Sequence, residues 1–279
     1  MKPLQLSIIG LGWLGSPLAE RLLQAGIAVR GSTTTAEKIP VLREKGIDAH
    51  LLHLNPAPEG DLTVLLDADY LVVNIPPKAG KQGDDFHPAQ MRLLADQVRS
   101  SRIRHILYVS STSVYPELNR DMIESDVVTP DESAAPALAT AEQAWLALAD
   151  ENLSGRAVTI VRCAGLMGDR RIPGKYVAGR TVDTGNVPVN YIHQVDAVGL
   201  IATVIEQSLS GTFNAVAPQH PTREAIYRKS CADFGYALPT FVEPAEPIPF
   251  KVINGDKLMQ ATGYVFTYPD PLAFPYSAV

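Results

Sequence analysis

Residues 4–26 read LQLSIIGLGWLGSPLAERLLQAG, in which a short apolar run passes through three closely spaced glycines into a helical pattern. The run LSIIG is typical of a buried strand. The segment after the glycines predicts a helix, because Leu18, Leu22 and Leu23 share one face and Gly26 ends the pattern. A strand, a GxGxxG turn and a helix in this order are the context in which a dinucleotide binds. An ordinary strand-to-helix corner also contains glycines, so the rest of the chain has to distinguish the two.

Each glycine of the turn has a distinct predicted role. Gly10 permits the tight turn, Gly12 leaves room for a pyrophosphate to approach backbone N–H groups, and Gly15 lets the helix pack closely on the strand. The positive end of the helix dipole then faces the phosphates. Trp13 and Leu14 lie between these glycines, and we expect them to contact the cofactor as well.

The end of the second strand, AVRGS at 28–32, indicates which dinucleotide is bound. NAD sites often carry an Asp or Glu here to bind the ribose hydroxyls, but this chain has no carboxylate before Glu37. Hydroxyls and cations suit the 2′-phosphate of NADP better, so NADP is favoured and NAD stays possible. The alternative is a solvated polar loop. The polar and cationic residues of this segment are Arg30, Ser32, Thr33, Thr34 and Lys38.

Composition excludes several classes of protein. The net charge of −6 argues against a nucleic-acid partner, which would need a basic surface. The two cysteines, Cys163 and Cys231, have no CxxC spacing, and the six histidines have no metal-like spacing. We therefore expect no disulfide framework, no metal site and a reducing, cytoplasmic location.

A secretory signal and a membrane span are the remaining alternatives at the N-terminus. The apolar run after Met1 and Lys2 is short, glycines interrupt it, and Glu20 and Arg21 follow where a cleavage site would be expected. No stretch approaches the roughly 18 apolar residues of a membrane span. A first buried strand is the better interpretation, and no membrane partner is expected.

The rest of the chain alternates apolar strands with helices, which predicts an α/β fold with a doubly wound parallel sheet of Rossmann type. Beyond Asp169 prolines and glycines become frequent, which indicates a smaller C-terminal substrate lobe. The predicted domains are a dinucleotide-binding domain at 1–169, to which a segment near 191–210 returns, and a lobe formed mainly by 170–279. Further strands are expected at 48–54, 70–77, 105–113 and 157–168, and helices at 39–46, 86–101 and 136–151.

The stretch YVSSTSVYP at 108–116 resembles the fifth strand of the extended short-chain dehydrogenase/reductases, which include nucleotide-sugar epimerases and dehydratases. The resemblance covers nearly the whole chain. It implies a Rossmann fold and an NAD(P)-dependent oxidoreductase or epimerase that acts on a nucleotide sugar or a related carbonyl or hydroxyl compound. Segments 157–168, 189–201, 211–216 and 252–272 are similar to later parts of that family, including its nucleoside-diphosphate-sugar epimerases.

The family relay uses a Tyr, a Lys four residues later and a Ser or Thr on the fifth strand. Ser111 matches the Ser/Thr position and is the predicted catalytic hydroxyl, with Tyr115 as a second candidate. Counting back from Glu142, Ala134 and Leu138 stand where the Tyr and Lys are expected, so the pair is missing. The chain resembles an atypical member. The alternative function is a catalytically impaired sensor or regulatory protein that binds NADP.

Other candidates follow from position in the resemblance. Strand ends are expected to supply further cofactor contacts, and the segment 170–180 is expected to form a lid whose cations bind an anionic substrate or are merely solvated. A structural role is favoured for two further candidates, Tyr176 and His193. The substrate is expected to be a small molecule, and a monomer and a homodimer both stay open. The expected contacts are Asn74, Ile75, Pro76, Ser110, Cys163 and Ala164, and the lid cations are Arg170, Arg171, Lys175 and Arg180.

Overall fold

The computed structural model describes residues 4–77, 82–150 and 155–277, and within them an eight-stranded sheet forms the centre. The neighbouring strands lie in the order β12-β8-β6-β5-β1-β2-β3-β4. Their bounds, in that order, are Gly211–Ala215, Ala157–Cys163, His105–Ser111, Tyr70–Val73, Gln5–Ile9, Ala28–Thr33, Asp48–Leu54 and Pro58–Gly60.

The chain reverses its direction across the sheet between β1 and β5. From β1 it proceeds outward through β2 and β3, and it then returns to place β5 on the other side of β1. Leu6 of β1 lies opposite Val29 of β2 on one side and Tyr70 of β5 on the other. All neighbouring pairs are parallel except β3 and β4, which are antiparallel at the edge. This reversal is the place where open α/β sheets bind ligands, beyond the carboxyl ends of the strands.

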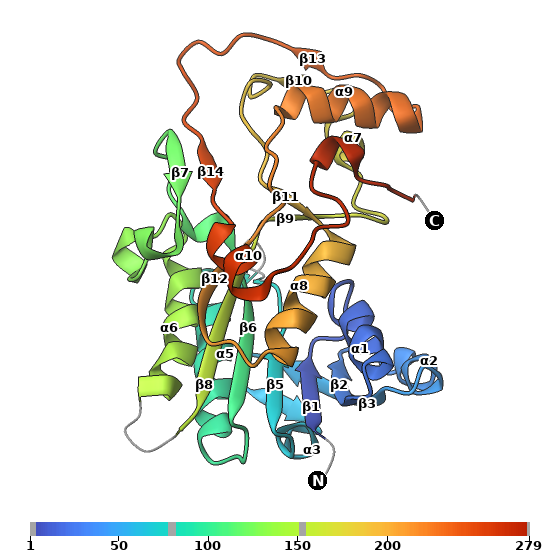
Figure 1. The fold of residues 1–279 in the computed structure, drawn as a ribbon, viewed down its shortest axis with the longest axis vertical. Coiled ribbons are helices and arrows are strands. Elements are labelled where there is room, and N and C mark those ends of the chain that lie inside the picture. Colours follow the sequence, from blue (N-terminus) through green and yellow to red (C-terminus); the bar gives the residue numbers. More distant parts are fainter. Residues whose placement is uncertain (1–3, 78–81, 151–154, 278–279) are drawn as a thin grey trace.

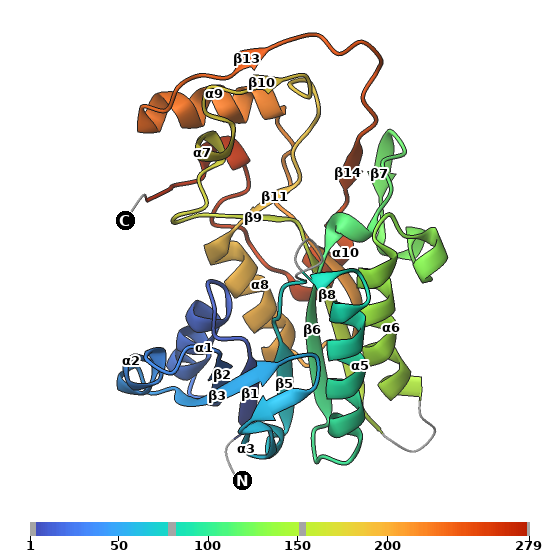
Figure 2. The same cartoon turned by 180° about the vertical axis from the view of Figure 1, so that it is seen from behind.

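Alternate residues of the apolar strands enter two separate cores, as the period of two along a strand requires. Leu6, Ile8 and Leu107 lie in the first core, whereas Ile9 and Ile106 lie in the second. Helices α1 (Gly15–Gln24), α2 (Lys38–Glu44) and α8 (Gln194–Glu206) cover the first face, and α3 (Leu62–Leu66), α5 (Phe86–Arg99) and α6 (Pro136–Asp150) cover the second (Figures 1 and 2). The predicted doubly wound α/β fold is confirmed.

A smaller lobe lies beyond the carboxyl ends of the central strands (Figure 1). It contains α7 (Pro173–Val177) packed against α9 (Arg223–Phe234), and the pair of β10 (Thr181–Val182) with β13 (Thr240–Phe241). Strands β9 (Gly165–Met167) and β11 (Tyr191–His193) connect it to the main body. The chain then returns to the main body through α8 and β12, and again through β14 (Lys251–Ile253), which pairs with β7 (Arg120–Met122), and α10 (Asp256–Thr262).

Candidate functional site

The glycine turn after β1 has two closely packed positions and one open position. A Cβ at Gly10, whose φ is +109°, would lie 2.2 Å from the Asn74 carbonyl oxygen, and a Cβ at Gly15 would lie 2.2 Å from the Gly10 carbonyl oxygen. Gly12 is exposed, and a Cβ there would have no described atom within 4 Å. Gly10 and Gly15 therefore serve the packing of turn, helix and strand, while Gly12 leaves space that a pyrophosphate would fill.

The ends of β2 and β5 hold this turn in place. The Gly10 N–H donates to Ser32 Oγ at 3.2 Å, and the Leu11 N–H donates to the Ser32 carbonyl at 2.7 Å. Asn74, directly after β5, donates its Nδ2–H to the Gly10 carbonyl at 3.2 Å. Among the described residues no side chain caps α1, and no acidic residue lies in its first turn. The helix N-terminus is therefore free to interact with an anion.

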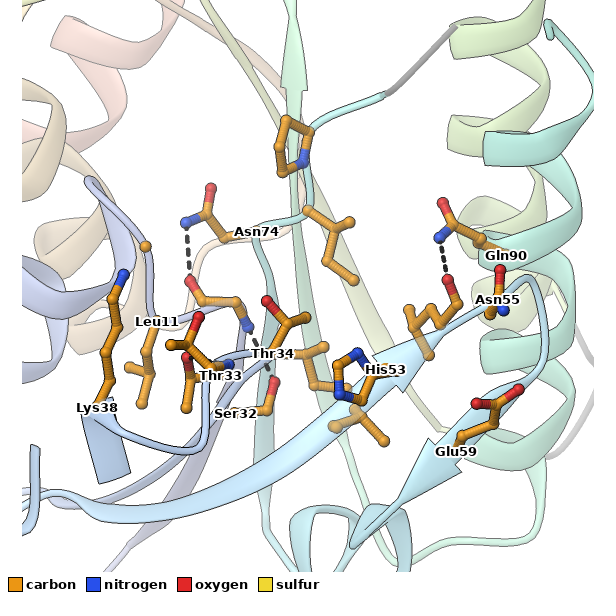
Figure 3. A pocket seen from close by; sticks show the side chains of 18 of the residues that line it. Leu11, Ser32, Thr33, Thr34, Lys38, His53, Asn55, Glu59, Asn74 and Gln90 are labelled. Carbon is orange, nitrogen blue, oxygen red and sulfur yellow. Dashed lines mark hydrogen bonds between the residues drawn. The ribbon is translucent and has the colours of Figure 1, made fainter. Parts of the chain in front are cut away.

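A pocket of about 390 Å³ opens beside the glycine turn, at the carboxyl ends of β1, β2 and β5. Figure 3 shows Lys38, Thr33 and Thr34 at one end, and Asn55, Glu59 and Gln90 at the other. The second end was missed in the sequence because these residues lie in β4, α5 and the loop after β3, far from the motif. Of the predicted cofactor residues, the pocket is lined by Gly10, Gly12, Ser32, Thr33, Thr34, Lys38, Asn74, Ile75 and Pro76.

The hydroxyls after β2 differ in their availability. Ser32 and Thr33 are buried, and their oxygens accept hydrogen bonds from the Gly10 and Thr35 N–H groups. Thr34 and Lys38 are exposed at the pocket. Arg30 was grouped with them in the sequence, but it does not line the pocket, and its guanidinium donates to Asp48 and to the carbonyls of Val64 and Asp67. Thr34 and Lys38 are therefore the groups best placed for a phosphate.

Two of the remaining predicted cofactor residues in the turn face away from the pocket. Leu14 is buried in the first core. Trp13 is half-buried, and its indole N–H donates to the Asp169 carbonyl at 2.9 Å. The Arg171 guanidinium lies 4.0 Å from the centre of the Trp13 ring, within the range of a cation–π contact. The predicted lid segment thus contacts the glycine turn through Arg171.

The two catalytic candidates, Ser111 at the end of β6 and Tyr115 four residues later, lie in different surroundings. Ser111 donates its hydroxyl to Ser113 Oγ at 3.0 Å, and it accepts from the Ser113 N–H at 3.1 Å. The Tyr115 side chain is fully buried: its hydroxyl donates to Asn214 Oδ1 at 2.7 Å and accepts from Arg162 at 2.9 Å. Burial raises the pKa of the Tyr115 phenol to about 12, although Arg162 opposes this shift. Tyr115 thus packs in the first core and lines neither of the two cleft pockets.

Ser110 belongs to a buried polar network that the sequence did not reveal. Its hydroxyl donates to Glu142 at 2.5 Å, and Arg162 forms an ion pair with the same carboxylate at 2.7 Å. Arg162 also donates to the Val127 carbonyl at 2.8 Å. The signal that could have revealed this network was Arg162, the one charge in the apolar strand β8, together with Glu142, the one charge in the interior of α6. The network fixes α6 against β6 and β8.

The positions expected for the missing Tyr and Lys carry no proton donor in their side chains. Ala134 is exposed and donates its N–H to the Val114 carbonyl, whereas Leu138 is packed in the first core. At the end of β8, Cys163 and Ala164 are buried, and burial raises the pKa of the Cys163 thiol to about 12. A buried thiol with a raised pKa stays protonated near neutral pH.

The remaining candidates have structural or surface positions. His193 accepts from the Val195 N–H at the start of α8 and donates Nε2–H to the Pro275 carbonyl at 3.1 Å. Desolvation lowers its pKa, which keeps the ring neutral. Tyr176 is exposed. None of the lid cations lines either cleft pocket within the described residues. Those residues also contain no group of three metal-ligating side chains and no helix long and apolar enough to cross a bilayer.

A second pocket, of about 230 Å³, lies between the end of β6 and the smaller lobe. Thr112 and Ser113 approach it from β6, Arg223 and Tyr227 from α9, and Lys251 from β14. Ser113 is exposed here and is hydrogen-bonded to the predicted Ser111. No sequence pattern indicated this pocket, because residues more than a hundred positions apart meet only in the folded chain.

Comparison with known proteins agrees with the geometry. Residues 7–215 match the NAD dependent epimerase/dehydratase family. The chain is 35% identical over 275 residues to protein YeeZ of Escherichia coli strain K12, covering 97% of this chain and 98% of that protein. The fold is similar to UDP-glucuronic acid 4-epimerase of Bacillus cereus in complex with UDP-glucuronic acid and NAD, with a TM-score of 0.76 and 15% identity over 96% of both chains. It is also similar to UDP-glucose 4-epimerase of Thermus thermophilus in complex with NAD, with a TM-score of 0.73 and 16% identity over 92% of this chain and 93% of that chain.

A Rossmann fold with an open glycine turn defines a nucleotide-binding protein. The family match is more specific than the fold, because it covers residues 7–215. The chain belongs to the NAD dependent epimerase/dehydratase family. Family membership and the space at Gly12 together support a nicotinamide dinucleotide as cofactor and an epimerase-like role on a small molecule.

Proposed function

We propose that the protein is an NADP-dependent oxidoreductase or epimerase that interconverts a hydroxyl and a carbonyl group on a nucleotide sugar or a related small molecule. The observation that carries the proposal is the first pocket, which joins the open Gly12 position to exposed Thr34 and Lys38. An ammonium and a hydroxyl stabilise a 2′-phosphate, and no carboxylate of the β2 end lines the described pocket to repel it.

The other end of this pocket suits an adenine ring. Asn55 and Glu59 provide amide and carboxylate oxygens that can accept hydrogen bonds from an exocyclic amino group, whereas Gln90 is buried and donates its amide N–H to the Leu54 carbonyl at 2.7 Å. Glu59 lies at the opposite end from Lys38 (Figure 3), so its charge is separated from the proposed phosphate position. The cofactor would supply or accept a hydride when bound. Ser111 is the predicted contact of the reacting oxygen, acting together with its hydrogen-bonded neighbour Ser113.

A catalytically impaired NADP sensor is the second candidate function. It is favoured by the absence of a proton-donating side chain at Ala134 and Leu138 and by the burial of Tyr115. Such a protein would bind the cofactor through the same turn and transmit its presence through the Arg171–Trp13 contact. For either function we propose a cytoplasmic location, in keeping with Cys163 and Cys231, which are both free and buried.

Titration calorimetry with NADPH and NADH tests the cofactor, and a panel of nucleotide sugars and simple carbonyl compounds tests turnover. The proposal expects tighter binding of NADPH and measurable oxidation of it with at least one carbonyl substrate. Tighter binding of NADH would reverse the cofactor preference. Binding of NADPH without turnover of any panel member would favour the sensor function.

A further inference from the structure

The second pocket lies next to Ser111, the predicted contact of the reacting oxygen, because Ser113 lines the pocket and is hydrogen-bonded to Ser111. Thr112 and Ser113 extend β6 into it, and the Tyr191 ring packs directly on Gly165, two residues after the end of β8. A Cβ added at Gly165 would lie 2.7 Å from Tyr191 Cδ1, so the two segments are in close contact. The pocket therefore borders the carboxyl ends of both β6 and β8.

Lys251 lines this pocket, and two neighbouring segments hold its backbone in place. Strand β14 pairs with β7, with Lys251 opposite Arg120, and the Lys251 carbonyl accepts from Asn190 Nδ2 at 2.9 Å. Its ammonium donates to the Tyr115 carbonyl at 2.5 Å. Among the described residues no carboxylate lies within ion-pair distance of it, so the remaining N–H groups can interact with a ligand in the pocket.

We propose that Lys251 is the proton donor and acceptor of this cleft. The inference rests on the proposed function. In the reducing direction a bound reduced nicotinamide would supply a hydride to the carbonyl carbon of the substrate, the π bond would open onto oxygen, and the oxygen would take a proton from the Lys251 ammonium. The neutral amine then regains a proton from water at the open side of the pocket. In the oxidising direction the neutral Lys251 amine removes the hydroxyl proton, and a bound oxidised nicotinamide would accept the hydride that leaves the carbon.

The surroundings of the ammonium suit this role. Desolvation lowers the pKa of Lys251 from its ordinary value of 10.5, while the charge of Glu117 partly opposes the shift. A proton donor works best when its pKa lies near the working pH, so a lowered value favours transfer in both directions. Ser113 in the same pocket offers a hydroxyl to hold the reacting oxygen.

Other titratable groups face the same space from each neighbouring element. Glu117 comes from the loop after β6, Tyr191 from β11, and Arg223 and Tyr227 from α9. Burial, together with Tyr227, raises the pKa of Tyr191, so its phenol stays protonated and does not compete as a base at neutral pH. Opposite Lys251 on β7, Arg120 is paired with Asp126 at 2.9 Å.

Three variants test the inference. Lys251→Met removes the ammonium and keeps the apolar stem, while Lys251→Arg keeps a positive charge that does not titrate. Lys257→Met is the matched control, because Lys257 also donates to a backbone carbonyl, that of Thr212 at 2.8 Å, but lies outside the pocket. Both Lys251 variants should bind NADPH as wild type does and lose about 10²–10⁴-fold in turnover. The Lys257 control should lose neither.

A titration independent of turnover completes the test. In protein whose lysines carry ¹³C-methyl groups, the NMR signal absent from Lys251→Met belongs to Lys251, and it should titrate below 10.5. A midpoint at or above 10.5, or turnover of Lys251→Met equal to that of the control, overturns the inference while leaving cofactor binding intact. NADPH binding by wild type without turnover of any carbonyl also overturns it. Failure of wild type to bind NADPH or NADH contradicts the proposed function itself.

Discussion

Replacing Gly12 with valine fills the space that a ligand would occupy and leaves the packing of the glycine turn unchanged. Gly12 is exposed, its φ lies outside the left-handed region, and a Cβ there would have no described atom within 4 Å. The valine should therefore change the free energy of unfolding by no more than about 0.5 kcal/mol, as for other surface substitutions. A cofactor, however, would have to place its pyrophosphate in the volume that the valine side chain occupies.

The expected loss of affinity follows from the backbone N–H groups that come after Gly12, because the Gly12 N–H itself donates to the Gly10 carbonyl at 2.9 Å. A hydrogen bond to a charged group contributes about 1.5–3 kcal/mol, so the loss of two from the pyrophosphate would cost roughly 3–6 kcal/mol. This corresponds to a Kd weakened by roughly 10²–10⁴-fold. NADPH and NADH should be affected alike, because they share the pyrophosphate.

Titration calorimetry measures both affinities, and thermal unfolding checks that the fold is intact. Gln24→Val is the matched control, since it introduces the same side chain at the exposed far end of the same helix. The control should keep the wild-type Kd. If Gly12→Val binds either dinucleotide with wild-type affinity, the pyrophosphate does not lie on this turn.

Three further variants address the buried network, the N-terminus of α8 and the cofactor preference. Arg162→Met leaves the Glu142 carboxylate buried without its partner and should lower the free energy of unfolding in urea by about 3–5 kcal/mol. Adding Glu142→Leu to this variant should recover most of the loss. Equal stability of the single and the double variant would contradict a coupled pair. The pKa of His193 is lowered from 6.5 in the fold, so unfolded chains bind more protons and its contribution to stability is lost as pH falls below about 6.5. His193→Asn, which can still accept from the Val195 N–H, should reduce that loss in thermal unfolding between about pH 5 and 8; an unchanged pH dependence would assign the loss to other groups. Thr34→Asp places a carboxylate at the exposed phosphate end of the first pocket and should weaken NADPH more than NADH by at least about tenfold in calorimetry, whereas an equal effect on both would remove the 2′-phosphate from this position.

The sequence predicted the glycine-turn end of the first pocket because the residues that form it are close together along the chain. The strand, turn and helix at 4–26 are neighbours along the chain, and the roles predicted for Gly10 and Gly15 correspond to two close backbone approaches in the structure. The end of β2 was found in the same way, although Arg30 faces Asp48 and not the pocket. Alternation of apolar strands and helices was sufficient for the doubly wound sheet.

The second pocket and the buried network could not be predicted, because both depend on contacts between distant segments. Lys251 meets Tyr115 only because β14 pairs with β7, and strands this short have no sequence pattern of their own. The position of Tyr115 also depends on tertiary structure, since Asn214 and Arg162 hold its hydroxyl inside the core. The spacing from Ser111 predicts that Tyr115 lies near the end of β6, but it does not give the direction of the Tyr115 side chain.

A crystal structure with NADP⁺ bound would test whether the two pockets form one reaction site. The pyrophosphate should lie against the backbone at Gly12, the 2′-phosphate should lie within hydrogen-bond distance of Thr34 and Lys38, and the nicotinamide ring should face the pocket of Ser113 and Lys251. A dinucleotide bound away from the glycine turn, or a nicotinamide ring that faces away from Ser113 and Lys251, would contradict it.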